Sequence, residues 1–242
     1  MKDVTELLTQ VKNKTLLVVF PHPDDETVMA AGLIRRAVQK GWRVVVVNLT
    51  KGEAGRIHIH GNGECVAKIR SNEFAKAMGL LGVKEFELWN CGDGNLRGSR
   101  SWRKQVDNLI LNIKPGIVVT YDHSGISGHP DHIALSVEIY KLLKSQKGVR
   151  LLWPSLVGKP RELMVNNQVK AYFNDPVWKL DMGIKELVLK WRAMKCHRSQ
   201  ALGKSLPVPL WVAMLKFRSE YFAEADFKNS YEHRYIQFDL GY

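Results

Sequence analysis

Two short segments of this chain carry residue types that bind metals and move protons. The first is Pro21-His22-Pro23-Asp24-Asp25-Glu26, and the second is Ser127-Gly128-His129-Pro130-Asp131-His132. Imidazole nitrogens and carboxylate oxygens both suit zinc. Each segment contains the tripeptide His-Pro-Asp. Chance is a poor explanation for this repetition, so we interpret the two segments as halves of one site.

The spacing within the first segment separates metal binding from proton transfer. His22 and Asp25 are three residues apart where the chain turns into a helix, which lets both side chains face one point. Asp24 cannot easily share that direction, so it is free to act as a general base. Adding His132 gives three protein ligands and an open fourth position, as in catalytic zinc sites. A water there is acidified and becomes the nucleophile.

The second segment supplies an acid. His129, polarised by Asp131, can stabilise an oxyanion and protonate a leaving amine. A carboxylate beside a working imidazole fixes its tautomer and orientation. The same residue types also have a purely structural interpretation, because the acidic run after Pro23 stabilises a helix N-terminus and histidines occur at helix starts as capping residues.

The surrounding sequence predicts the elements that hold these segments. Short β-rich runs alternate with helical periodicity up to about Trp153. Expected strands are Leu16–Phe20, Arg43–Leu49, Glu85–Leu88, Ile117–Thr120 and Val149–Trp153. Expected helices run through Ala30–Val38 (ended by Gly41), Glu64–Met78, Ser101–Ile113 and His129–Lys144. Alternation of this kind predicts an α/β fold with a mostly parallel sheet and helices on both faces. Both segments follow a strand and open a helix, so they should meet at the carboxyl edge of the sheet.

The chain after Trp153 is less regular. We expect a strand at Val169–Phe173 and a helix at Ile184–His197. The prolines of Leu206–Trp211 exclude a mid-helix position. Aromatic and aliphatic residues recur at roughly helical intervals from Trp211 to Phe222, which is typical of a core-facing stripe. We therefore expect a single domain over residues 1–242, with a core at about 14–200 and a C-terminal elaboration at about 201–242.

The two His/Asp segments resemble the signature of the PIG-L/LmbE-like N-acetylglucosamine de-N-acetylases. The resemblance implies a Rossmann-like fold and removal of an acetyl group from an N-acetylglucosamine-type sugar conjugate. It implies zinc (or another divalent metal such as Fe²⁺) on His22, Asp25 and His132. It also implies Asp24 as general base and His129, supported by Asp131, as the acid and oxyanion residue.

Further matches extend the resemblance over about residues 16–200. Glu53, Arg70 and Asp93 look like the family's sugar-binding positions, where charge-assisted hydrogen bonds could orient ring hydroxyls. Their ordinary interpretation is an exposed ion pair on a helix and a turn aspartate. His197 with Ser199 and Gln200 is similar to a pattern near the C-terminal end of family members. His58 and His60 lie in a glycine-containing loop, and we do not assign them as ligands.

The amino-acid composition indicates which kinds of molecule the protein binds. The net charge of +12 favours anionic partners, so a phosphate or carboxylate on the sugar conjugate fits. The cations are dispersed and no nucleic-acid-reading element is recognisable, which makes a basic nucleic-acid- or membrane-binding module the weaker alternative. A zinc hydrolase of another amide or of an ester is the other alternative.

Location and assembly are less well determined. The three cysteines show no Cys-x-x-Cys spacing, and we expect them to be reduced and buried. No transmembrane segment or secretory leader is recognisable, so we expect a cytoplasmic protein. The sequence does not determine the oligomeric state.

Overall fold

A computed structural model describes residues 1–55, 65–200 and 218–228 of the chain. Within them the strands are β1 (Lys2–Asp3), β2 (Thr15–Phe20), β3 (Arg43–Asn48), β4 (Glu85–Leu88), β5 (Ile117–Val119), β6 (Arg150–Ser155), β7 (Trp178–Asp181) and β8 (Ser219–Glu224). The helices are α1 (Val4–Gln10), α2 (Asp25–Gln39), α3 (Val66–Leu81), α4 (Ser101–Ile113), α5 (Gly125–Gly128), α6 (Pro130–Lys144), α7 (Lys159–Met164) and α8 (Ile184–Met194). Turns of 3₁₀ helix occupy Lys170–Tyr172 and Arg198–Gln200.

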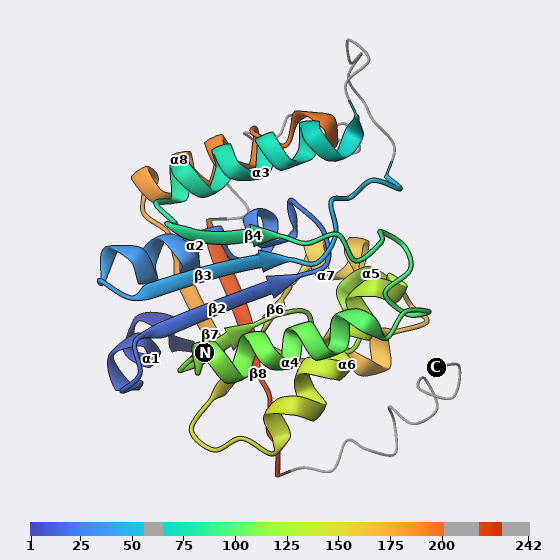
Figure 1. The fold of residues 1–242 in the computed structure, drawn as a ribbon. Helices are drawn as coiled ribbons and strands as arrows, with labels where there is room; N and C mark the ends of the chain where they lie inside the picture. The colour runs from blue at the N-terminus through green and yellow to red at the C-terminus, as the bar shows by residue number, and fades with distance from the viewer. Residues whose placement is uncertain (56–64, 201–217, 229–242) are drawn as a thin grey trace.

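The described strands form one sheet with the order β1-β7-β8-β6-β5-β2-β3-β4. All neighbouring pairs are parallel except the two made by β8, which lies antiparallel to both β6 and β7. Figure 1 shows α3 and α8 side by side on one side of the molecule and α4 with α6 on the other. The predicted Rossmann-like α/β fold with a mostly parallel sheet is therefore confirmed.

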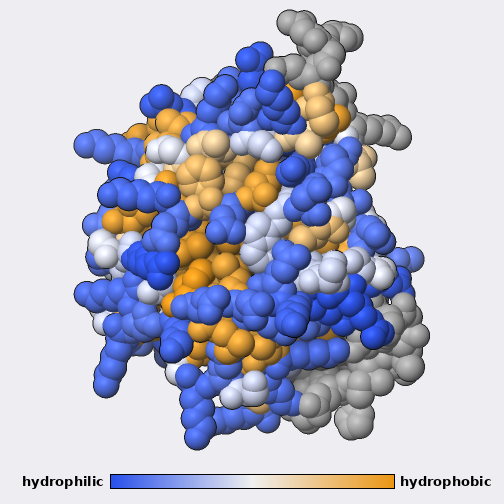
Figure 2. All heavy atoms as spheres, viewed as in Figure 1, coloured by the Kyte–Doolittle hydropathy of each residue, from blue (hydrophilic) through white to orange (hydrophobic). Residues whose placement is uncertain are grey.

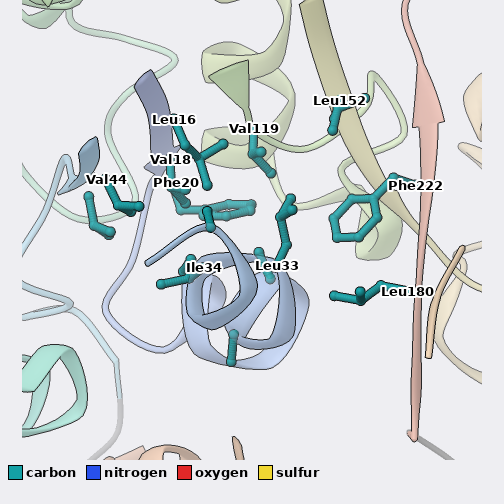
Figure 3. Close-up of a cluster of buried hydrophobic side chains, with 14 of the residues drawn as sticks. Leu16, Val18, Phe20, Leu33, Ile34, Val44, Val119, Leu152, Leu180 and Phe222 are labelled. Carbon is teal, nitrogen blue, oxygen red and sulfur yellow. The ribbon is translucent and has the colours of Figure 1, made fainter. Parts of the chain in front are cut away.

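The side chains of β2 contribute to two hydrophobic clusters, one on each face of the sheet, because successive side chains of a strand point to opposite faces. Leu16, Val18 and Phe20 belong to the cluster on the α2 side. Leu17 and Val19 belong to the cluster on the α4 and α6 side. Figure 3 shows the first cluster, in which Leu33 and Ile34 of α2 point toward the side chains of the sheet. Burial on both faces explains why β2 is apolar along its whole length.

The predictions fit best where apolar periodicity is strong. Glu85–Leu88 and Ser101–Ile113 have the predicted bounds, and the other elements predicted before residue 150 differ at their ends by a few residues. The short elements β1, α1 and α5 were not predicted. The strand predicted at Val169–Phe173 is wrong, since Lys170–Tyr172 is a 3₁₀ turn whose side chains are only partly buried or exposed. The helical interpretation of the C-terminal stripe is wrong at Tyr221 and Phe222, which belong to β8. Residues 201–217, including Trp211, lie outside the described residues.

The described part of the C-terminal segment contributes a strand to the sheet. Strand β8 lies inside the sheet, between β6 and β7, and Phe222 is fully buried. The expectation that the three cysteines are buried is wrong: they are unpaired as expected, but Cys65, at the N-cap of α3, is exposed, and Cys91 and Cys196 are only partly buried. Among the described residues, no helix has the length and apolar character needed to cross a bilayer. Figure 2 shows apolar side chains extending from the upper to the lower part of this face, with hydrophilic side chains among and around them.

A buried ion pair fastens α2 to the C-terminal strand. The Glu220 carboxylate accepts hydrogen bonds from Lys190 Nζ at 2.7 Å and from the backbone N–H groups of Gly32 and Leu33 at 2.7 and 2.9 Å. Glu220 and Lys190 are each only 4% exposed. A Cβ at Gly32 would lie 2.7 Å from Met182 Sδ and 3.0 Å from the Glu220 carboxylate, so a side chain there would displace these two side chains. The pair therefore fixes the helix that carries Asp25 at its first turn.

Glu220→Ala should lower the free energy of unfolding by about 3–5 kcal/mol, because it leaves the Lys190 ammonium buried without a carboxylate. Urea denaturation measures this loss. The matched control is Glu85→Ala, which breaks an ion pair with Arg43 whose side chains are 47% and 50% exposed. The control should cost no more than about 1 kcal/mol. Equal losses in the two variants would contradict the role given to Glu220.

Candidate metal-dependent active site

The two His/Asp segments meet at the carboxyl edge of the sheet. His22 follows β2, and Asp25 opens α2. His132 lies in the first turn of α6, which follows β5 and the short helix α5. Because β2 and β5 are parallel neighbours, the loops after them share one edge. His22 Nδ1 lies 3.3 Å from His132 Nε2, although the residues are 110 positions apart.

The predicted ligands bring three donor atoms together. Asp25 Oδ2 lies 3.5 Å from His22 Nδ1 and 3.7 Å from His132 Nε2. Asp25 Oδ1 accepts a hydrogen bond from the Tyr121 hydroxyl at 2.6 Å, and the Tyr121 ring stacks on His132 with centroids 4.1 Å apart. Tyr121 thus holds two of the three predicted ligands, Asp25 and His132, in place. Sequence reasoning missed Tyr121, which has no recognisable signal except its position just after β5.

When both rings are neutral, their protons lie on the sides facing away from these three atoms. His132 Nδ1 is 3.1 Å from the carbonyl oxygen of Gly125, which only accepts, so Nδ1 carries the proton. His22 Nε2 faces the carboxylates of Asp131 at 3.3 Å and Asp93 at 3.0 Å. In the neutral rings, the lone pairs of His22 Nδ1 and His132 Nε2 then point toward each other and toward the Asp25 carboxylate. This donor set suits a cation.

The electrostatics agree with a cation site. Burial alone lowers the pKa of His22, but hydrogen bonds to Asp131, Asp25 and Asp93 outweigh it and raise that pKa to about 12. In the metal-free protein, a proton on His22 therefore neutralises part of the negative charge around it. Burial lowers the pKa of His132 to about 4, which keeps its ring neutral and able to donate a lone pair.

Two other trios also bring ligand atoms within 4.8 Å of one another in the described residues. They are His22, His129 and His132, and His22, Asp93 and Asp131. All contain His22, so one cluster of acids and histidines with several possible ligand combinations occupies this edge. The cluster can hold a metal ion. His58 and His60 lie outside the described residues.

Asp24 is placed beside the donor atoms in a strained conformation. Its φ of 115° and ψ of −30° lie in a region that L residues rarely adopt. The Asp24 N–H donates to Glu26 Oε2 at 3.2 Å, and the Asp24 carbonyl accepts from Thr27 and Val28 in the first turn of α2. Burial, and next the charge of Asp25, raise the pKa of Asp24 to about 8. A carboxyl with such a pKa is suited to accept a proton near neutral pH.

A buried network behind Asp24 maintains this geometry. Glu26 is fully buried and also accepts from Thr27 Oγ1 at 2.6 Å and from Asn48 Nδ2 at 2.7 Å. His197 Nε2 lies 3.3 Å from Thr27 Oγ1 and 3.6 Å from Glu26 Oε1. The sequence pattern had pointed to His197 without a role. From the sequence alone, Glu26 is only part of an acidic helix start.

His129 faces the site from the N-cap of α6. Its Nδ1 accepts the backbone N–H of Asp131 at 3.2 Å, so the proton of the neutral ring is on Nε2. Its ring centroid lies 4.8 Å from that of His22 and 4.8 Å from that of His132. Burial, and then the nearby His22, lower the pKa of His129, so a neutral ring with an Nε2–H donor is present at neutral pH.

The predicted pairing of Asp131 with His129 is not the arrangement found. The Asp131 carboxylate accepts from Gly94 N at 2.8 Å and Leu96 N at 3.0 Å and contacts His22 Nε2. Asp131 hydrogen-bonds to His129 through its backbone N–H instead, and its carboxylate acts on that ring only through its charge, which opposes the lowering of the His129 pKa by burial. The reason is geometric: both residues lie at the start of α6, where the imidazole of His129 caps the helix and the Asp131 side chain points to the β4–α4 loop.

The three predicted sugar-binding residues lie together beside His22, but much of their polar capacity is used within the protein. Glu53 accepts the N–H groups of Asp93 at 3.0 Å and Lys51 at 3.1 Å. Asp93 Oδ2 accepts from Ala54 N at 2.9 Å. Arg70 is only 3% exposed, and its guanidinium donates to the carbonyl of Gly52. These residues therefore join the loops after β3 and β4 into one wall of the site.

Known proteins with related sequences align with part of the chain. It is 30% identical to a 1D-myo-inositol 2-acetamido-2-deoxy-alpha-D-glucopyranoside deacetylase of Thermobispora bispora over 146 residues, which are 50% of this chain and 48% of that protein. It is 34% identical to the diacetylchitobiose deacetylase of Thermococcus kodakarensis over 120 residues, 49% of this chain and 45% of that protein. The chain thus spans about half the length of the curated relatives it matches.

Solved structures share the fold at low identity. An N,N'-diacetylchitobiose deacetylase from Pyrococcus horikoshii superposes with a TM-score of 0.72 at 21% identity, covering 93% of this chain and 88% of that one. A 4-carboxy-2-hydroxymuconate hydratase from Pseudomonas putida gives 0.65 at 18% identity, covering 88% and 96%. The names of these two proteins describe different reactions, so the shared fold alone does not define the chemistry.

The family described as GlcNAc-PI de-N-acetylase (PIG-L) matches residues 17–142, just over half of the chain. That range begins in β2 and ends in α6, so it contains both His/Asp segments and the β4–α4 loop that contacts them. On this match, and with the two segments meeting at one edge of the expected sheet, the chain belongs to the PIG-L family.

Proposed function

We propose that this protein is a zinc-dependent hydrolase that removes the acetyl group from an N-acetylglucosamine-type sugar conjugate. The observation that carries the proposal is the convergence of His22 Nδ1, Asp25 Oδ2 and His132 Nε2 at separations of 3.3, 3.5 and 3.7 Å. Ligands at ~2.0–2.1 Å from a tetrahedral zinc are roughly 3.3–3.4 Å apart, so these donors fit zinc with little adjustment. Two imidazoles and one carboxylate also suit Fe²⁺, which is the alternative metal.

The residues around the three metal ligands have different roles in the proposed reaction. Zinc, when bound, acidifies water and polarises the acetyl carbonyl. Asp24 accepts the proton of the attacking water, since its carboxylate is not committed to the donor set. His129 directs its Nε2–H into the site, where it stabilises negative charge on the carbonyl oxygen. The proton that Asp24 takes from the water then passes to the leaving amine as the C–N bond breaks, because a neutral His129 ring that gave up its Nε2 proton would become an imidazolate.

The proposed substrate is a small amino-sugar conjugate. Relatives named as deacetylases of N-acetylated sugars support this choice. Glu53, Arg70 and Asp93 contribute the wall against which the sugar ring is oriented. The charge of +12 favours a conjugate with a phosphate or carboxylate, and no nucleic acid is expected as a partner. Unpaired cysteines, usual in a reducing compartment, support a cytoplasmic location.

A metal-dependent hydrolase of another amide or of an ester remains the second candidate. The donor set, Asp24 and His129 would serve such a substrate equally well, because they contact the reacting carbonyl and the water rather than the sugar. The choice between the two candidates depends on the wall formed by Glu53, Arg70 and Asp93, and on the relatives' names.

Acetate release from a panel of N-acetylglucosamine conjugates tests the proposal directly. We expect turnover of these conjugates with zinc present, and a higher kcat/KM when the aglycone carries a phosphate or carboxylate. Aryl acetates and N-acetylated amino acids serve as comparison substrates. Cleavage confined to the comparison substrates would favour the second candidate.

Asp24→Asn should reduce kcat by about 100- to 10,000-fold, the usual contribution of a general base. Its zinc content should stay at that of the parent protein, because Asp24 is not a ligand. Asp175→Asn is the control, since Asp175 is an exposed partner of Arg161 on the surface and should not alter kcat. Near-normal turnover by Asp24→Asn would exclude Asp24 as the base.

Removal of metal by a chelator should abolish acetate release, and about one equivalent of zinc per chain should restore it. Parallel reconstitution with Fe²⁺ without oxygen shows which metal supports the higher kcat. Chelator-insensitive hydrolysis would contradict the metal mechanism.

Tight, salt-sensitive binding of DNA or anionic vesicles by the metal-free protein, without hydrolysis, would instead favour a basic binding module.

A further inference from the structure

Asp131 makes contacts that its place in the second segment did not suggest. It is fully buried, and each carboxylate oxygen accepts a backbone N–H of the β4–α4 loop, Gly94 N at 2.8 Å on Oδ2 and Leu96 N at 3.0 Å on Oδ1. Oδ2 also lies 3.3 Å from His22 Nε2, within a hydrogen bond. These two backbone contacts therefore fix the position of the Asp131 carboxylate independently of His22.

We propose that Asp131 is the positioning residue of His22 rather than of His129. A histidine that binds a metal through one ring nitrogen commonly donates its other N–H to a carboxylate, which fixes the ring orientation and raises its basicity as a ligand. Asp131 Oδ2 and Asp93 Oδ1 both offer such an acceptor at Nε2, at 3.3 and 3.0 Å, and leave Nδ1 aimed at Asp25 and His132. Asp131 is the one whose two carboxylate oxygens are each fixed by a backbone N–H. This inference rests on the proposed function, because it assumes that the donor set binds zinc.

His129 has no comparable need of the Asp131 carboxylate. The backbone N–H of Asp131 already occupies His129 Nδ1 and determines its tautomer. A carboxylate can only accept a hydrogen bond, and the Nε2–H of His129 is the group required at the substrate. The main chain thus orients the His129 ring, and the Asp131 side chain is left to orient the metal ligand.

A second metal held by His22, Asp93 and Asp131 is disfavoured by the same proton assignment. A neutral imidazole has one lone pair and one N–H. If Nδ1 binds the metal shared with Asp25 and His132, Nε2 keeps its proton and cannot be a ligand as well. Asp93 and Asp131 then act as acceptors for that proton.

The contacts of Asp131 also connect the metal ligand to the predicted sugar wall. The loop that it fastens through Gly94 and Leu96 contains Asp93, whose N–H is held by Glu53. Loss of the Asp131 carboxylate should therefore disturb both His22 and this loop, so a change in KM is expected beside the change in metal affinity.

The test is zinc affinity, measured by competition with a chromophoric chelator. Asp131→Asn should bind zinc about 10- to 100-fold more weakly than the parent protein, the usual effect of losing such a partner. His129→Gln is the matched control at the same helix start and should keep the parent affinity while losing turnover. Unchanged zinc affinity in a folded Asp131→Asn, with turnover reduced as in His129→Gln, would overturn the inference and restore the Asp131–His129 pairing.

The same titration separates this inference from the proposed function. If the parent protein fails to bind zinc, both are wrong. If His129→Gln loses zinc affinity, His129 is a ligand, so the proposed donor set is wrong and the inference fails with it.

Nitrogen-15 NMR of the zinc-loaded parent protein gives an answer that does not depend on how a variant folds. His22 should carry its proton on Nε2 and bind zinc through Nδ1. A proton on Nδ1 would overturn the inference.

Discussion

Three lone pairs directed at one point impose the main constraint on this structure. In the neutral rings, His22 Nδ1 and His132 Nε2 face each other at 3.3 Å, with a carboxylate oxygen of Asp25 within 3.7 Å of both. Such an arrangement is repulsive unless a cation or a proton occupies it. The surrounding hydrogen bonds maintain it, because Gly125 accepts from the far side of His132 and Tyr121 donates to the far oxygen of Asp25.

The scaffold holds that point rigidly from several directions. The parallel pairing of β2 with β5 brings the starts of α2 and α6 together, and the Glu220–Lys190 pair fixes α2 along its middle. The strained backbone of Asp24 persists because Glu26 binds its N–H within a buried network. Strain of this kind concentrates at functional sites, where the surrounding structure determines the conformation. This arrangement keeps the Asp24 carboxyl beside the three predicted metal ligands without making it a fourth ligand.

Much of the fold could be predicted because apolar periodicity dominates the first 150 residues. Strand β2 is apolar throughout and α4 has one apolar face, so both follow from local patterns. Strand β8 could not be found this way, since its alternation depends on pairing with β6 and β7, which lie far away in sequence. The residues Tyr221 and Phe222 fit a helical interval and a strand equally well.

In the candidate site, too, some features could be predicted from the sequence and others could not. Residue type and spacing were enough to predict that His22, Asp25 and His132 meet, because strand ends and helix starts define the edge. The partner of Asp131 could not be predicted, since His22 and His129 are equally plausible by sequence and only the path of the β4–α4 loop decides between them. Tyr121 and Glu26 were missed because their roles depend on contacts across the sheet edge.

His22, Asp25 and His132 are the proposed metal ligands. Anomalous diffraction from zinc-soaked crystals tests this assignment most directly. We predict a zinc peak in contact with His22 Nδ1, an Asp25 carboxylate oxygen and His132 Nε2. A peak on the opposite side of the His22 ring, between Nε2 and the carboxylates of Asp93 and Asp131, would contradict it.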